Sequence, residues 1–262
     1  MTAGIPKPQV DTGRPHPARV YDHLLGGKDH YLVDSQVAEQ LPPEAANGAR
    51  HNRAFMTRAV AHLARRGIDQ FLDIGTGIPT APNLHQVVQG INPRARIVYT
   101  DNDPIVLRHA EALLISTPEG GTDYIEADVR EPGRILSHAR DFLDFDRPLA
   151  LSLVALMHFI PEEQDPYGIV ATLVDALPSG SYLVLSNAGS DVLPEIAAKV
   201  TGEYARGGIR LAFRTRAEVA RFFDGLELIG PGLTTAHEWS ADGPAPEAAM
   251  NSGMHAGVAR VP

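Results

Sequence analysis

Residues 71–80 (FLDIGTGIPT) join an apolar run to an aspartate and two glycines, an order that suits ligand binding. Gly75 and Gly77 can adopt the positive φ angles of a tight turn and let the backbone approach a ligand where a Cβ would collide. The third glycine of the dinucleotide fingerprint is replaced by Pro79. The carboxylate of Asp73 would repel phosphates and attract cations. The motif therefore indicates a nucleotide-like ligand with an ammonium group rather than a pyrophosphate.

Two further aspartates end the next two apolar runs of the chain. Asp101 follows the run RIVYT, at a position where a carboxylate can accept hydrogen bonds from ribose hydroxyls. Asp128 ends the run DYIEAD in the corresponding place. Each aspartate alone could instead cap the helix that follows it, because aspartate is a favoured capping and turn residue. The three carboxylates Asp73, Asp101 and Asp128 together, beside a glycine turn, favour a binding site.

The chain from residue 70 onward predicts the sheet that would position these aspartates. Strand-like runs alternate there with helix-like stretches, which is typical of βαβ units and a parallel sheet. The runs are mostly apolar rather than alternating, as expected when helices cover both faces of the sheet. The strand-like runs are residues 71–74, 96–101, 123–128, 148–156 and 181–186. The helix-like stretches between them are residues 80–90, 104–114, 132–143 and 165–177.

The remainder of this domain is predicted to be two more helices and two more strands. The helices fall near residues 193–203 and 215–223, and the late strand candidates are residues 226–239 and 255–261. The last strand is expected to close the sheet.

The N-terminal part of the chain is predicted to lie outside the sheet. Prolines are frequent in residues 1–18 and indicate an extended arm. Residues 18–41 suggest two short helices around a pair of glycines, and residues 47–67 show the apolar stripe of a third helix. We therefore expect an arm and helical lid over residues 1–50 and one α/β domain over residues 51–262.

Composition excludes several classes of function. The net charge of -9 disfavours nucleic acid as a partner, because phosphate binding needs clustered Lys and Arg. The chain has no cysteine, which removes disulfides, thiolate zinc sites and iron–sulfur clusters, and we predict no metal site. No apolar run approaches the length that spans a bilayer, and the first residues lack the apolar segment of a secretory signal. The expectation is a cytoplasmic protein without a membrane partner.

At the residues described above, the chain resembles the class I S-adenosylmethionine-dependent methyltransferases. Their first motif is similar to residues 73–77, and their second strand ends in an acidic residue such as Asp101. More narrowly, the chain resembles an actinobacterial family of S-adenosylmethionine-dependent methyltransferases that was first catalogued as a domain of unknown function. This narrower resemblance covers nearly the whole chain. It is carried by the stretches PHPARVYDHLLGGKDHYLVD, NRAFMTRAV, QFLDIGTGIPT, YTDNDPIVL and RTRAEVARFFDGLELIGPGL.

The resemblance implies a Rossmann-like fold. This would be a seven-stranded, mostly parallel sheet with an antiparallel last strand, helices on both faces and an N-terminal helical lid. The implied cofactor is S-adenosyl-L-methionine, bound at the carboxyl ends of the strands. Carried over by motif position, Asp73, Gly75 and Gly77 would lie along its methionine part.

The other cofactor contacts implied by the resemblance follow the next two strands and the preceding helix. Asp101 would hold the ribose, with Asn102 beside it in the cofactor site, and Asp128 with Val129 would meet the adenine. Arg53 could pair with the methionine carboxylate, since a guanidinium binds a carboxylate in a bidentate manner. The alternative for Arg53 is a solvated helix charge.

The polar segment around the glycine pair gives a further hypothesis. Tyr21, Gly26 and Lys28 would help to close the cofactor or acceptor pocket, because the segment is more polar than solubility requires. The alternative is a helical brace with solvated charges.

Methyl transfer needs mainly alignment of the acceptor and exclusion of water. His158, after the fourth predicted strand, is a weak candidate for a general base. The alternative, which we favour, is a histidine that packs and forms hydrogen bonds within the fold.

The sequence thus predicts a methyltransferase with a small-molecule acceptor that no motif specifies. A noncatalytic S-adenosylmethionine-binding regulator is the alternative function. A nicotinamide-dependent oxidoreductase is disfavoured by the missing third glycine and by Asp73.

Overall fold

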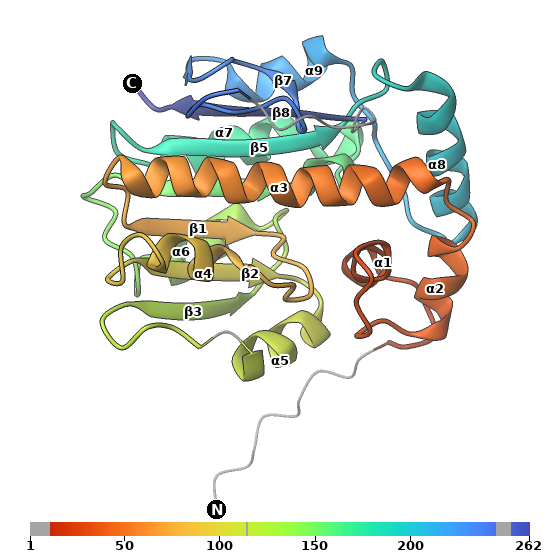
Figure 1. Ribbon diagram of the computed structural model, residues 1–262, viewed down its shortest axis with the longest axis horizontal. Coiled ribbons are helices and arrows are strands. Elements are labelled where there is room, and N and C mark those ends of the chain that lie inside the picture. The colour runs from red at the N-terminus through yellow and green to blue at the C-terminus, as the bar shows by residue number, and fades with distance from the viewer. Residues whose placement is uncertain (1–10, 114, 245–252) are drawn as a thin grey trace, which may run out of the picture.

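The structure is a central sheet with helices on both faces (Figure 1). It is a computed structural model that describes residues 11–113, 115–244 and 253–262. The strands lie in the order β3-β2-β1-β4-β5-β8-β6, and β7 also pairs with β8. The strands are β1 (Gln70–Ile74), β2 (Arg96–Asp101), β3 (Gly121–Glu126), β4 (Ala150–Val154), β5 (Tyr182–Ala188), β6 (Glu227–Leu228), β7 (Thr234–Thr235) and β8 (Met254–Arg260).

The first five strands are parallel and bring their carboxyl ends to one edge of the sheet. Leu72 pairs with Val98, and Asp73 pairs with Tyr99, so β1 and β2 end side by side. The chain builds outward to β3 on one side of β1 and then returns to β4 on the other side. Such a reversal of strand order leaves a crevice at the carboxyl ends, where α/β sheets bind ligands.

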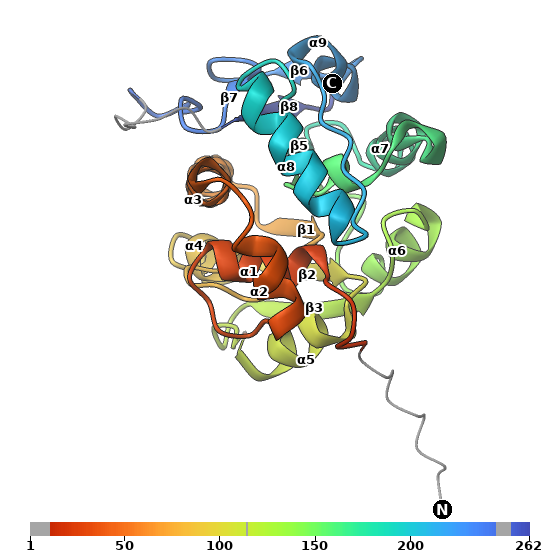
Figure 2. The ribbon, with the colours of Figure 1, turned by 90° about the vertical axis from the view of Figure 1, so that its right-hand side faces the viewer.

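The helices cover the two faces because the strands are apolar on both sides. Figures 1 and 2 show α3 and α4 on one face and α6 and α7 on the other. The helices are α1 (Pro17–Leu24), α2 (Leu32–Ala38), α3 (Pro43–Arg65), α4 (Leu84–Gln89), α5 (Pro104–Leu113), α6 (Pro132–Ala139), α7 (Pro166–Asp175), α8 (Pro194–Arg206) and α9 (Arg216–Ala220). Two large apolar clusters, one on each face, fill the space between sheet and helices.

Helices α1 and α2 lie beyond the carboxyl ends of the strands rather than against a face of the sheet (Figures 1 and 2). A third apolar cluster joins them to α8 through Val20, Val37, Val200 and Tyr204. These helices therefore form the helical lid that the sequence led us to expect.

The fold confirms the expected Rossmann-like architecture with an antiparallel last strand, and the described residues form eight strands in place of seven. The extra strand arises because the late strand candidate is interrupted. Gly230 and Gly232 adopt φ angles of 65° and 79° between the two-residue strands β6 and β7. Both short strands pair with β8.

The extent of α3 and the start of α1 bear on two expectations for the N-terminal part of the chain. Helix α3 runs without a break from Pro43 to Arg65 and so crosses the boundary expected at residue 50. Of the arm predicted over residues 1–18, residues 1–10 lie outside the described part of the chain. Helix α1 already begins at Pro17.

Candidate functional site

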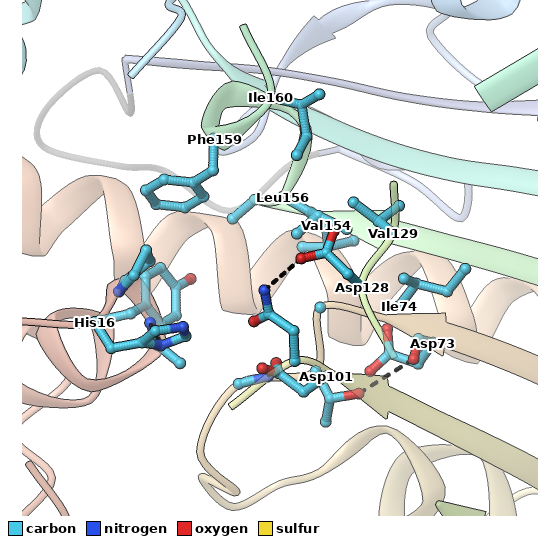
Figure 3. A pocket seen from close by; sticks show the side chains of 18 of the residues that line it. His16, Asp73, Ile74, Asp101, Asp128, Val129, Val154, Leu156, Phe159 and Ile160 are labelled. Carbon is cyan, nitrogen blue, oxygen red and sulfur yellow. Dashed lines mark hydrogen bonds between the residues drawn. The ribbon is translucent and has the colours of Figure 1, made fainter. Parts of the chain in front are cut away.

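A cavity of about 450 Å³ lies at the carboxyl ends of the parallel strands, beneath the lid. Its walls come from the ends of β1, β2, β3 and β4, from α1 and α3, and from the segment that follows α8. Figure 3 shows Asp73, Asp101 and Asp128 gathered in this cavity, with His16 across from them and Phe159 above. Nearly all of the sequence-predicted site residues line it: Tyr21, Arg53, Asp73, Gly75, Gly77, Asp101, Asn102, Asp128 and Val129.

The glycine turn after β1 is tied to the neighbouring strand. The backbone N–H groups of Gly75 and Thr76 both donate to the carbonyl of Thr100, at 2.8 and 3.1 Å. Gly75 and Gly77 have φ angles of 75° and 68°, which only glycine adopts at low cost. A Cβ on Gly75 would lie 2.7 Å from the side chain of Leu156, whereas one on Gly77 would meet nothing within 4 Å. Space for a ligand therefore remains beside Gly77.

Asp73 belongs to β1, the strand that lies between β2 and β4. It is the penultimate residue of β1, with Ile74 between it and the glycine turn, and it lines the cavity. Burial raises its pKa, because a charged carboxylate loses hydration there. A cationic group in the cavity would restore the lost stabilisation of the charge.

Asp101 accepts hydrogen bonds both from the glycine turn and from the residues that follow β2. Its Oδ2 accepts a hydrogen bond from the N–H of Gly77 at 2.8 Å, and its Oδ1 accepts from the N–H of Asp103 at 3.0 Å. Burial raises the pKa of Asp101. A carboxylate has about four acceptor sites, so each oxygen retains capacity for a hydroxyl donor in the cavity.

Asp128 is held from two sides. Arg130 donates to both of its oxygens, from Nε at 2.7 Å and from Nη2 at 2.5 Å, and Asn102 Nδ2 donates at 2.8 Å. Burial alone would raise the pKa of Asp128, but these hydrogen bonds outweigh it and lower the pKa to about 2. Asp128 is therefore fixed as a carboxylate above the buried side chain of Val129.

Arg53 projects from α3 to the loop that follows β1. Its Nη2 donates to the carbonyls of Thr80 and Pro82, at 2.5 and 2.8 Å. Within the described part of the chain, no carboxylate lies within ion-pair distance of Arg53. The guanidinium is thus positioned in the cavity wall by neutral carbonyls and keeps donors for an anionic group.

The lid contributes Tyr21 to the cavity, but not the two other residues predicted from it. Gly26 and Lys28 are exposed and line neither this cavity nor a second one next to it, so the structure gives their assignment to the pocket no support. Both residues follow the end of α1, in a turn where Gly26 has a φ of 82°. Buried Asp22 braces this turn by accepting hydrogen bonds from Asp29 and His30.

His158 is buried beside the cavity and is already engaged. Its Nδ1 accepts a hydrogen bond from the N–H of Ala188 at 3.3 Å. Burial, with a smaller effect from the charge of Arg214, lowers the pKa of His158 to about 3. The ring is therefore neutral with its proton on Nε2, which suits a hydrogen-bond donor and favours the packing interpretation over a general base.

Several lining residues were missed by the sequence analysis. His16 lies in the segment expected to be an extended arm, yet its Nδ1 is 3.2 Å from Oδ2 of Asp103. Asn52 precedes Arg53 on α3, and a polar residue inside an apolar helical stripe was the available signal. Phe159 and residues 208–210 carried no signal of their own, since they reach the cavity only through packing.

In the part of the chain that the structure describes, no helix is both long enough and apolar enough to cross a membrane. The same residues contain no cluster of histidine and acidic side chains arranged to hold a metal ion.

Comparisons with known proteins agree with this geometry. A family profile described as S-adenosyl methyltransferase matches residues 3–262. The crystal structure of a DUF574 family protein from Streptomyces avermitilis is similar, with a TM-score of 0.92 and 45% identity, over 97% of this chain and 100% of that one. A Thermobifida fusca protein gives a TM-score of 0.86 at 37% identity, over 99% of both chains.

More distant structures share the fold alone. Magnesium protoporphyrin IX methyltransferase from Synechocystis, solved with bound S-adenosylhomocysteine, is 12% identical with a TM-score of 0.53, over 92% of each chain. No curated protein matches the sequence.

Proposed function

The chain belongs to the S-adenosyl methyltransferase family, and from this premise we propose that it methylates a small-molecule acceptor through the cavity beneath its lid. It is an S-adenosylmethionine-dependent methyltransferase. The observation that supports the proposal is the set of three carboxylates, Asp73, Asp101 and Asp128, around the glycine turn of the cavity beneath the lid.

The residues in the cavity fit S-adenosylmethionine. Asp73 offers a carboxylate to its ammonium group, and Asp101 offers acceptors to the ribose hydroxyls. Gly77 leaves open space where a Cβ would stand, and Arg53 has donors for the methionine carboxylate. We assign these four roles, and place the adenine against Val129 with Asp128 and Asn102 at its edge. When bound, S-adenosylmethionine supplies a methyl group that is activated by a sulfonium.

The chain's own contribution is to orient the acceptor and to exclude water. The lid helix α1 covers the cavity with His16 and Tyr21, so an acceptor must fit between the lid and the strand ends. A covered cavity of this size suits a small molecule, whereas a polymer would need an open groove. The net charge of -9 also disfavours nucleic acid.

The proposal is tested with methyl-labelled S-adenosylmethionine and a cell extract separated by ultrafiltration into small molecules and macromolecules. We expect label from the wild-type protein to accumulate in the small-molecule fraction. The Asp101→Ala variant is the control, because it should lose cofactor binding and with it all transfer. Label found in protein or nucleic acid would overturn the assignment of a small acceptor.

Isothermal titration calorimetry separates cofactor binding from transfer. S-adenosylmethionine and S-adenosylhomocysteine should both bind the wild-type protein, while NAD should not, because Asp73 opposes a pyrophosphate. Binding of NAD in place of S-adenosylhomocysteine would contradict the cofactor roles given to these residues.

A further inference from the structure

A second cavity, of about 100 Å³, adjoins the first on the side of α8. Four residues line both cavities and so form the wall between them: Tyr21, Asn52, Ala155 and Phe159. They come from α1, α3, the end of β4 and the following turn. The two cavities therefore adjoin at a wall built by three segments of the chain: α1, α3 and the stretch after β4.

The polar groups of this wall form a chain of hydrogen bonds. Tyr21 Oη donates to the carbonyl of Ala49 at 3.0 Å and accepts from Asn52 Nδ2 at 3.1 Å. Ser186 Oγ is hydrogen-bonded to Asn52 Oδ1 and accepts from the N–H of Ala155 at 2.9 Å. The chain links the lid to β5 and fixes the wall in place.

Ala155 is held in an unusual conformation within this wall. Its φ of 56° is left-handed, which costs a non-glycine residue energy and is typical of functional sites. The hydrogen bond to Ser186 stabilises that conformation. The strained residue lies where the two cavities meet.

The rest of the second cavity is apolar. Aliphatic and aromatic side chains from α1, α3, α8, the segment after α8 and β8 dominate its lining. They are Leu24, Ala45, Ala49, Leu193, Ile196, Ala197, Val200, Leu211, Phe213 and Met254. A ligand that fills this space is bound mainly by removal of its apolar surface from water.

The ionisable side chains that line the second cavity offer no positive charge to an anionic ligand. No lysine or arginine is among the described residues that line the second cavity. His158 is neutral there, and burial raises the pKa of Tyr204 above its ordinary value, so that side chain is a neutral phenol. Glu44, in the first turn of α3, is the carboxylate of the lining and would repel a second negative charge.

Glu44 and Asn52 lie on the same helix, eight residues apart. At 1.5 Å per residue, this separates them by about 12 Å along α3. A molecule that fills the second cavity therefore has one end near Asn52, at the wall between the cavities, and its other end toward the carboxylate of Glu44.

From these observations we propose that the second cavity is the acceptor subsite, and that it takes a small, largely apolar molecule without an acidic group. This inference rests on the proposed function, since it assigns the space beside the cofactor cavity to the molecule that is methylated. The reacting atom of the acceptor lies at the wall formed by Tyr21, Asn52, Ala155 and Phe159. Acidic metabolites and phosphorylated compounds are excluded, because burial of their charge would go uncompensated.

Three probes with one ring system test the chemistry of the subsite: indole, tryptamine and indole-3-acetate. They are neutral, cationic and anionic at neutral pH, and their binding is measured by saturation-transfer NMR in the presence of S-adenosylhomocysteine. We expect indole and tryptamine to bind and indole-3-acetate to bind at least about tenfold more weakly. Equal or tighter binding of the acid would overturn the exclusion of anions.

A substitution that fills the cavity tests its location. Ala197, on α8, is buried and lines the second cavity but not the first. Ala197→Phe should abolish probe binding and leave the calorimetric affinity for S-adenosylhomocysteine within about twofold of wild type. Ala205→Phe, on the exposed side of the same helix, is the matched control and should bind all probes as the wild type does. Ala45→Leu, on the opposite wall, replaces Ala197→Phe should that variant not fold.

The readouts distinguish the two proposals. Failure of every variant and of the wild type to bind S-adenosylhomocysteine would count against the proposed function. Normal binding of S-adenosylhomocysteine, with probe binding that survives both Ala197→Phe and Ala45→Leu, would place the acceptor elsewhere and refute the subsite alone.

Discussion

The Nε atom of Arg19 lies 2.9 Å from Oδ2 of Asp103, and both side chains are buried. Arg19 belongs to the lid helix α1, whereas Asp103 lies between β2 and α5, at the carboxyl end of the sheet. Asp34, on α2, is fully buried and lies 3.7 Å from the same guanidinium. One buried arginine therefore fastens both lid helices to the end of the sheet.

Replacement of this arginine should loosen the lid. Arg19→Met keeps much of the side-chain volume but leaves two buried carboxylates without their cation, which costs about 3 kcal/mol of stability. We expect lower thermal stability, faster amide hydrogen exchange across α1 and α2, and an affinity for S-adenosylhomocysteine reduced by about tenfold. Arg14→Gln is the matched control, because its ion pair with Asp11 is exposed and 3.9 Å long. Unchanged exchange in the lid of Arg19→Met would refute the role of this pair.

The two glycines of the turn should respond differently to alanine. Both have positive φ, so each substitution costs about 1 to 2 kcal/mol. Gly75→Ala should destabilise the protein further, because its Cβ would collide with Leu156, whereas Gly77→Ala should mainly reduce cofactor affinity by filling open space in the cavity. Thermal unfolding and calorimetry with S-adenosylhomocysteine measure the two effects. Gly133→Ala, at an uncrowded helical position, should leave cofactor affinity unchanged and should not lower the stability. A reversed order of the first two variants would contradict the geometry.

His158 should make the protein less stable as the pH falls. Its folded-state pKa is about 3 while its unfolded-state pKa is near 6.5, so between these values only the unfolded chain takes up a proton. The free energy of unfolding should therefore fall from pH 7 to pH 5 by about 2 kcal/mol on account of this residue. Urea denaturation at both pH values measures the change. His158→Asn retains an acceptor for the N–H of Ala188 and should lose that part of the pH dependence; a variant with the same slope as wild type would exclude a neutral His158.

Arg214 should be essential for the stability of the turn after β4, which carries Phe159. Its buried guanidinium donates to the carbonyls of Met157 and Ile160, both at 2.8 Å, and thereby holds the turn after β4. Arg214→Met should cost about 3 kcal/mol in urea denaturation, because these carbonyls lose their charged donor. Arg206→Met, which removes an exposed pair with a glutamate one helical turn away, should cost less than about 0.5 kcal/mol. Equal losses in the two variants would be inconsistent with a structural role for the buried arginine.

Much of the fold was predictable because its signals are local. The apolar runs that became β1 to β5 are covered on both faces, and the prolines at 104, 132 and 194 stand at the starts of α5, α6 and α8. The division of the late strand into β6 and β7 was missed, although Gly230 and Gly232 on either side of Pro231 are a local turn signal. The sequence does not show which residues of β8 the two short strands pair with.

The site was predictable where it follows the strand ends and not where it depends on the lid. Asp73 and Asp101 sit at fixed positions of parallel strands, so their proximity follows from the strand order. Tyr21 reaches the cavity but Gly26 and Lys28 do not, because the lid is oriented by the pair Arg19–Asp103, whose members are 84 residues apart. No periodicity in the sequence reports such a contact.

The position of β8 also determines when the sheet can be completed during synthesis. Because β8 pairs with β5, β6 and β7, the outer edge of β5 has no partner in this sheet until residue 260 has left the ribosome. At about 5 to 20 residues per second, the chain from β5 to the end of β8 takes several seconds to appear. During that time the nascent protein presents an open strand edge, the kind of surface that promotes aggregation and recruits chaperones. The cofactor half of the sheet, from β1 to β4, can form before this interval begins.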